Sequence, residues 1–207
     1  MTTRLLLVRH GQTAYNAEVR FMGQLDIPLD EIGRVQAQAV ARRLSHERPL
    51  SIYCSGLSRA YDTAAAIQSV IPSHPELRVD GRLTEGHFGL WQGKTYDSLR
   101  KEDADRLAKW EADRLAVAPP EGESLPEIAV RVRAAYADIC ADNQGKAAIV
   151  VAHGGSLQVL IALALDLPIE HYWKLWVSNA SVSELRIDEW GVILHLLNDV
   201  SHLTPGL

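Results

Sequence analysis

The sequence has few cysteines, no basic tract and no long apolar run, and each shortage argues against a class of protein. Two cysteines, Cys54 and Cys140, do not make a disulfide scaffold. A membrane helix needs about 20 consecutive apolar residues, and no run approaches that length. The formal net charge of −5, without clustered lysine or arginine, argues against nucleic acid or a membrane as partner. No leader peptide precedes the first apolar run, so the sequence predicts a cytoplasmic protein.

Short apolar runs alternate with amphipathic segments along the 207 residues. The runs at 4–8, 50–55, 76–80 and 146–153 read as strands, and the patterns at 30–45, 57–71, 124–142 and 155–167 read as helices. Two extended runs around Glu189-Trp190-Gly191 predict a hairpin. This order predicts a single α/β domain, a three-layer α/β/α sandwich with a mostly parallel sheet and an antiparallel edge strand.

More specific predictions can be made for two of the helices and for one polar segment. The helix over 30–45 should bury one apolar face that includes Ile32 and Val35. Ser124 and Glu127 form the S-x-x-E capping box that predicts the start of the helix over 124–142. Residues 84–123, polar and poor in strong apolar positions, are interpreted as a small insertion or lid.

Two arginines and two histidines are expected at one edge of the sheet. The first strand ends in Arg9-His10, Arg59 lies in the first turn of the helix after the second strand, and the strand over 146–153 ends at His153. Ligands of open α/β sheets bind at the carboxyl ends of the strands, and helix N-termini there supply free N–H groups. Gly154 would allow close backbone approach to a ligand. These features favour a dianionic tetrahedral group such as phosphate.

Five motifs in order along the chain resemble the signatures of the histidine phosphatase superfamily, the phosphoglycerate mutase-like enzymes. They are LLLVRHGQTAYN (5–16), YCSGLSRAYDTA (53–64), LTEGHFGLWQG (83–93), GES (122–124) and VVAHGG (150–155). Cys54 stands where the family usually has serine, and Gln92 where it often has glutamate.

The resemblance implies a role for each matching residue. It implies that His10 is the nucleophile that becomes phosphohistidine and that Glu85 is the proton donor. Arg9, Arg59 and His153 would bind the phosphoryl oxygens with help from Asn16.

The residue chemistry agrees with these roles. A neutral imidazole is a good nucleophile near pH 7, and two arginines with a second histidine neutralise phosphate without a metal or other cofactor. The eight histidines show no pair spacing typical of a metal site.

Other readings of the same residues are less favoured. Cys54 and Arg59 nearly match the C-x5-R loop of cysteine phosphatases, but that loop would be one residue short. No G-x-S-x-G elbow of a serine hydrolase is present. A phosphate-binding domain without turnover is the non-enzymatic alternative, and the presence of both His10 and Glu85 argues against it.

The expected activity is a metal-independent phosphatase that acts on a small-metabolite phosphomonoester of the phosphoserine, α-ribazole phosphate or sugar phosphate type. A phosphoglycerate mutase is the alternative. The resemblance implies paired arginines after the glutamate loop in glycolytic mutases, and KWEADR at 109–114 has no such pair. Residues expected to determine specificity are Met22, Gly23, Gln24, His87 and His202. The apolar stretch over 169–176 is compatible with a homodimer.

Overall fold

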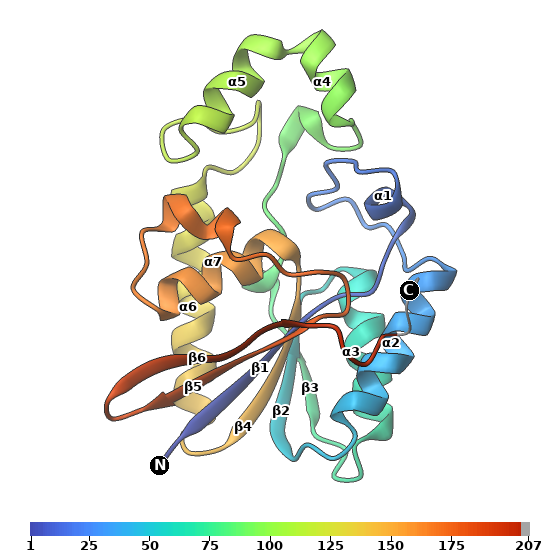
Figure 1. Ribbon diagram of the computed structural model, residues 1–207, viewed down its shortest axis with the longest axis vertical. Helices are drawn as coiled ribbons and strands as arrows, with labels where there is room; N and C mark the ends of the chain where they lie inside the picture. Colours follow the sequence, from blue (N-terminus) through green and yellow to red (C-terminus); the bar gives the residue numbers. More distant parts are fainter. Residues whose placement is uncertain (204–207) are drawn as a thin grey trace.

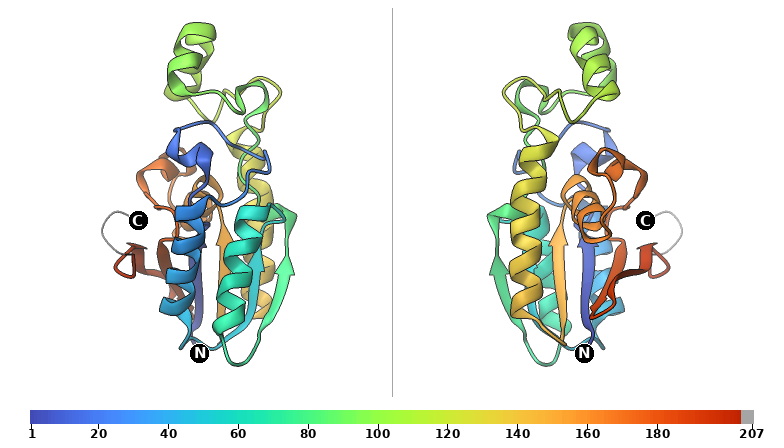
Figure 2. Two further views of the ribbon diagram at one scale, coloured as in Figure 1. Left: turned by 90° about the vertical axis from the view of Figure 1, so that its right-hand side faces the viewer. Right: turned by 90° about the vertical axis from the view of Figure 1, so that its left-hand side faces the viewer.

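The computed structural model describes residues 1–203, which form a central six-stranded sheet with helices on both faces (Figure 1 and Figure 2). The strands are β1 (Thr3–Arg9), β2 (Pro49–Cys54), β3 (Glu76–Val79), β4 (Ala147–Ala152), β5 (Val182–Asp188) and β6 (Gly191–Asp199). Their order in the sheet is β3-β2-β4-β1-β5-β6. The first four run parallel, whereas β5 and β6 are antiparallel and form the predicted hairpin at one edge. The predicted mostly parallel α/β/α sandwich is confirmed.

Alternate residues of each inner strand contact the two helical layers. In β1, Leu6 and Val8 pack with the layer of α2 (Glu31–Leu44) and α3 (Ser58–Val70). Leu5 and Leu7 pack with the opposite layer of α6 (Leu125–Asp142) and α7 (Gly154–Ala164). Because both faces are covered, these strands are apolar throughout rather than alternating with polar residues.

The expectation that Ile32 and Val35 are buried is wrong. Their side chains are 39% and 47% exposed, while Gly33 and Gln36 face inward. The reason is a close contact between α2 and the loop after β1: a Cβ on Gly33 would collide with the backbone of Gln12. Gln36 Oε1 also accepts a hydrogen bond from the Gln12 N–H at 2.8 Å. Ala39, Val40 and Leu44, also predicted on this face, are buried, so the prediction fails only in the first part of the helix, where a small residue and a polar residue face inward instead.

The remaining helical elements lie mainly near the carboxyl edge of the sheet. They are α1 (Ala14–Ala17), α4 (Tyr96–Glu102), α5 (Ala104–Ala112) and the 3₁₀ helices η1 (Gly81–Leu83), η2 (Gly89–Trp91) and η3 (Ile169–Lys174). Among the described residues, no helix has both the length and the apolarity needed to cross a membrane.

Residues 84–123, called the cap segment below, extend beyond the carboxyl edge of the sheet with α4 and α5 farthest out (Figure 1). The cap segment has an aromatic core of its own, in which Trp91 and Trp110 meet edge-on at 5.6 Å between ring centroids. Phe21, from the loop after β1, packs into this core at 5.1 Å from Phe88. The cap segment is thus joined to the loop that follows the first strand.

Candidate active site

His10 follows the last residue of β1 and is 1% exposed. Its Nδ1 lies 2.6 Å from the carbonyl oxygen of Gly11, which can only accept, so Nδ1 carries the proton. Nε2 is then left with a lone pair. Burial, and next the positive charges of Arg9 and Arg59, hold the pKa of His10 well below its usual value. The ring is therefore neutral at pH 7 and held in the tautomer that a nucleophile needs.

Two arginine side chains lie beside His10. Arg59, in the first turn of α3, is fully buried and donates from Nη2 to Gly23 O at 2.8 Å and from Nη1 to Leu25 O at 2.7 Å. Burial lowers its pKa to about 10, which still leaves it charged at pH 7. Arg9 donates from Nη1 to Val177 O at 2.9 Å. Both guanidinium groups are fixed by backbone carbonyls rather than by carboxylates, so their charge is available to a bound anion.

His153 follows β4 and precedes α7, and its ring centroid lies 5.0 Å from that of His10. Nε2 of His153 is 2.6 Å from Ser55 Oγ, and burial lowers the pKa of His153 well below its usual value. Nothing in the sequence pointed to Ser55 as this partner. The direction of this hydrogen bond follows the tautomer: the Ser55 hydroxyl donates to Nε2 when Nδ1 carries the ring proton, and Nε2 donates to Ser55 Oγ when Nε2 carries it.

Three nitrogen atoms of this group are buried without a hydrogen-bond partner among residues 1–203: Arg9 Nε, Arg59 Nε and His153 Nδ1. Buried donors of native proteins are almost always paired, so each unpaired donor needs an explanation. The two arginine donors, with the ring nitrogen of His153 beside them, form a site around the neutral imidazole of His10 for a group with several acceptor oxygens. The predicted grouping of Arg9, His10, Arg59 and His153 at one sheet edge is what the structure shows.

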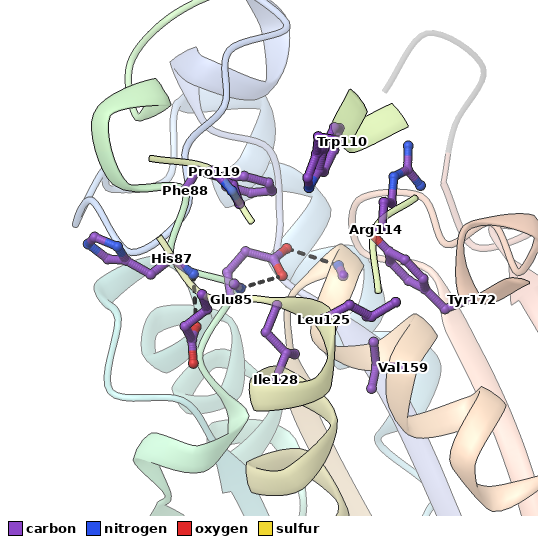
Figure 3. Close-up of a pocket in the computed structure, with 13 residues that line it drawn as sticks. Glu85, His87, Phe88, Trp110, Arg114, Pro119, Leu125, Ile128, Val159 and Tyr172 are labelled. Atoms are coloured by element: carbon purple, nitrogen blue, oxygen red, sulfur yellow. Dashed lines mark hydrogen bonds between the residues drawn. The ribbon is translucent and has the colours of Figure 1, made fainter. Parts of the chain in front are cut away.

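Glu85 sits in the cap segment and binds the N-terminus of α7 (Figure 3). Its carboxylate accepts from the N–H groups of Gly155 at 2.9 Å and Ser156 at 3.1 Å, and from Gly86 at 3.0 Å. A Cβ on Gly155 would lie 2.5 Å from Glu85 Oε1, so glycine is needed for this approach. These contacts fix the carboxylate in the wall of the same cleft that contains His10.

Arg131 of α6 holds the loop that carries Glu85. It donates to the carbonyl oxygens of Thr84 at 2.7 Å and Glu85 at 3.0 Å, and to that of Arg82 at 2.8 Å. It also forms a two-pronged ion pair with Glu123, at 2.8 and 2.9 Å. Burial alone would raise the pKa of Glu123, but its hydrogen bonds to Arg131 and to the His87 N–H bring the net pKa below the usual value. Nothing local to Arg131 in the sequence indicates these partners, so its role is visible only in the structure.

Asn16 and Asn179 meet at the mouth of the site. Asn179 Nδ2 donates to His10 O at 3.1 Å and to Asn16 Oδ1 at 3.2 Å, and both residues line the cleft. Asn179 was missed by the sequence reading. Gly154 lies against Arg9, since a Cβ there would come 3.5 Å from the guanidinium carbon.

The expected specificity residues lie in different places. Met22 and Gly23 line the cleft, as predicted for residues that reach over the nucleophile. Gln24 and His202 are not among the described lining residues of this cleft. Gln24 instead bonds Glu85 O and Glu123, and His202 Nε2 bonds Ala180 O at 2.9 Å behind the end of β1. His87 lines a small pocket on the other side of Glu85, and the imidazole ring of His87 points away from Glu85 (Figure 3).

The cleft above His10 has a volume of about 380 Å³ and is bounded by Arg9, Arg59 and Glu85 at its inner end. Cys54 is packed in the core on the α2–α3 side, and burial raises the pKa of its thiol to about 11. A thiol with that pKa is protonated at pH 7, which argues against the cysteine phosphatase reading. In the described part of the chain no three His, Cys, Asp or Glu side chains are placed to hold a metal ion.

A family model for the histidine phosphatase superfamily (branch 1) matches residues 5–200. The chain belongs to this superfamily. A histidine phosphatase of Mycobacterium tuberculosis, glucosyl-3-phosphoglycerate phosphatase, is 36% identical over 95% of this chain and 98% of its own. The solved structure of the mycobacterial enzyme with VO3 matches with a TM-score of 0.85, at 36% identity, over 94% of this chain and 98% of that one.

Other relatives share the superfamily fold under different names. The structure of Bacillus stearothermophilus YhfR matches with a TM-score of 0.89 at 32% identity, over 97% of this chain and 98% of that one. A probable phosphoglycerate mutase of Photorhabdus laumondii is 36% identical over 99% of this chain and 97% of its own. Phosphatases and mutase-like proteins are therefore both present among the relatives.

Proposed function

We propose that the protein hydrolyses phosphomonoesters of small metabolites through a phosphohistidine formed on His10 Nε2. The observation that supports this most directly is the set of three buried nitrogen atoms without a hydrogen-bond partner among residues 1–203, on Arg9, Arg59 and His153, around a neutral imidazole of fixed tautomer. The mycobacterial relative was solved in complex with VO3, which is a phosphate-like oxyanion, and this supports the proposal. No metal is required, because these side chains supply the charge that phosphoryl transfer needs.

In the first step, the Nε2 lone pair of His10 attacks phosphorus and the bond to the ester oxygen breaks. Arg9, Arg59 and the Nδ1–H of His153 donate to the three peripheral oxygens, where charge spreads in the transition state. The ester oxygen leaves with a proton from Glu85.

In the second step, water attacks the phosphohistidine. Glu85, now ionised, accepts a proton from the water, and the N–P bond breaks to return a neutral His10 and release phosphate. The carbonyl of Gly11 holds the Nδ1–H throughout both steps, so the ring does not need to reorient between them.

The mutase-like relative keeps phosphoglycerate mutase as a second candidate. A mutase transfers the phosphoryl group from the same phosphohistidine to a sugar acid instead of to water. Incubation with 3-phosphoglycerate separates the two activities: release of inorganic phosphate indicates a phosphatase, and formation of 2-phosphoglycerate indicates a mutase.

Rapid quenching with ³²P-labelled phosphomonoester tests the proposal. We expect a protein-bound label that is stable in alkali and lost in acid, as a phosphoramidate should be, and that is absent in His10→Asn. Cys54→Ser should retain the label. A label on another residue, or turnover without any label in a resolved burst, contradicts the proposal.

A further inference from the structure

The outer part of the cleft above His10 is lined by aromatic side chains from three separate segments. Tyr15 comes from α1, Tyr96 from α4, and Trp176 from the connection between η3 and β5. Trp176 is 65% exposed although it is a large apolar side chain. Isolated exposed tryptophans are not unusual, but one that joins two tyrosines at the mouth of a catalytic cleft indicates a binding surface.

This aromatic wall is firmly supported on the side of the cap segment. The ring of Tyr96 packs at 4.7 Å from that of Phe21, which in turn contacts the aromatic core of the cap segment. Trp176 is oriented by its Nε1–H, which donates to Ser178 Oγ at 3.1 Å. The wall is therefore largely preformed, which reduces the ordering cost of binding a flat group against it.

The wall offers no unpaired positive charge among the described residues that line it. Arg20 is the one cation there besides Arg9 and Arg59. Its Nε pairs with the carboxylate of Glu18, and its Nη1 donates to Gly93 O at 2.8 Å. A carboxylate on the leaving group, as in phosphoserine or phosphoglycerate, would have to share the charge of Arg20 with Glu18.

The reaction geometry directs the leaving group toward this wall. Arg9, Arg59 and His153 hold the phosphoryl oxygens at the inner end of the cleft, and Glu85 must reach the ester oxygen. The rest of the substrate then lies in the remaining part of the cleft, whose lining includes Tyr15, Tyr96 and Trp176.

We infer that this wall binds a ring on the leaving group, so that the protein prefers phosphomonoesters of ring-bearing alcohols over small acyclic acids. The inference rests on the proposed phosphatase activity and names its substrate class. The shared chemistry is a ring with an apolar face, which an aromatic alcohol or a sugar can present. Trp176 is then a specificity residue that contacts the leaving group rather than the phosphate.

Matched substrates separate ring binding from leaving-group basicity. Benzyl phosphate and glucose 6-phosphate carry a ring on a primary alcohol, while ethyl phosphate and phosphoserine do not. We expect kcat/KM to be at least about tenfold higher for benzyl phosphate than for ethyl phosphate, since an aromatic contact contributes about two- to twelvefold beyond the buried area of the ring. Glucose 6-phosphate distinguishes a sugar site from a purely aromatic one by whether it shares this advantage.

Trp176→Ala should reduce the benzyl-to-ethyl ratio of kcat/KM by about three- to tenfold, with KM changing more than kcat. Trp173→Ala is the matched control, because Trp173 is also exposed, at 52%, and does not line the cleft. It should leave the ratio unchanged. An equal loss on benzyl and ethyl phosphate in Trp176→Ala, or a wild-type preference for phosphoserine, overturns the inference.

The affinity of His10→Ala for the same esters provides a readout that does not need turnover. Calorimetry should show tighter binding of benzyl than of ethyl phosphate, and addition of Trp176→Ala should remove most of the difference. If the wild type hydrolyses no substrate but His10→Ala binds benzyl phosphate more tightly than ethyl phosphate, the proposed function fails and the ring site stands. If hydrolysis occurs with no ring preference in either assay, the ring site fails and the proposed function stands.

Discussion

The inner and outer halves of the same cleft are built in opposite ways. The inner half consists of buried, charged or ionisable side chains that directly follow strands or begin helices, such as His10, Arg59 and His153. The outer half consists of aromatic side chains from loops and short helices, with Trp176 largely exposed. The inner half is held by the sheet and the outer half by the cap segment and connections.

This difference separates two tasks. Transfer of a phosphoryl group requires fixed donors at fixed distances, which the ends of a rigid parallel sheet provide. Discrimination among leaving groups requires a surface that can vary without disturbing those donors, and loops meet that need. Glu85 is the residue at the boundary, since it belongs to the cap segment but is bound to the N-terminus of α7.

The largest effect is expected at the centre of the inner half. His10→Ala should lower kcat by about 10³-fold or more on every phosphomonoester, because it removes the proposed nucleophile. Cys54→Ser, at a core position with a protonated thiol, should retain most of the activity. Steady-state assays with p-nitrophenyl phosphate measure both, and an active His10→Ala beside an inactive Cys54→Ser reverses the assignment.

The site residues differ in how far the sequence could predict them. Arg9, His10 and His153 could be placed because they lie at or directly after the ends of apolar strands, and parallel strands end at one edge. Glu85 was assigned only by the resemblance of its motif, since its binding to α7 joins segments about 70 positions apart. Ser55, Arg131 and Asn179 act through tertiary contacts that leave no local pattern.

The fold was predictable to a similar degree. Strand and helix order, the hairpin of β5 and β6 and the capping box at Ser124 follow from local patterns, and the structure has them. The inward position of Gly33 and Gln36 in α2 does not, because the close approach of Gly33 to the loop after β1 is decided by tertiary packing. The aromatic wall escaped prediction for the same reason, since its residues come from segments that only the fold brings together.

The second largest effect is expected at Glu85, and it distinguishes the proton donor from the residues that bind the phosphoryl oxygens. Glu85→Gln should reduce phosphorylation of the enzyme by about 10²–10⁴-fold with an alkyl ester, which expels a basic alkoxide. The loss should be much smaller with p-nitrophenyl phosphate, whose leaving group needs no proton. Arg59→Ala should affect both esters alike, because charge on the phosphoryl oxygens is common to them. Burst amplitudes as well as steady-state rates must be measured, and equal slowing of the burst by Glu85→Gln on both esters would show that Glu85 is not the acid.

The third largest effect is expected at Arg131 and tests whether this residue positions Glu85 for proton transfer. Arg131→Lys keeps a positive charge near Glu123 but loses the planar fork that contacts three backbone carbonyls. We expect a loss of about tenfold in the rate of enzyme phosphorylation with an alkyl ester and less than about threefold with p-nitrophenyl phosphate, because misplacement of Glu85 slows this step only where the leaving group needs a proton. Arg133→Lys, on the exposed side of α6, is the control and should change neither rate. Equal losses on both esters would indicate a general structural defect instead.

The smallest effect concerns stability and depends on the neutral histidines of the inner half. Burial, before any charge effect, holds the pKa values of His10 and His153 well below the usual 6.5, so both stay neutral in the folded protein. In the unfolded chain they take up protons as the pH falls below about 6.5. The unfolded state then binds more protons than the native state, so the free energy of unfolding must decrease between about pH 7 and 5.

Each histidine contributes at most about 1.4 kcal/mol per pH unit in this window, which corresponds to a shift of a few degrees in Tm. Thermal unfolding of the double variant His10→Asn/His153→Asn should show a shallower loss of Tm from pH 7 to 5 than the wild type. His74→Asn, at an exposed turn, is the control and should leave the slope unchanged. A double variant with the wild-type slope would show that the two histidines are not held neutral. A buried nucleophile that stays neutral would then no longer distinguish the inner half of the cleft from the exposed aromatic wall of the outer half.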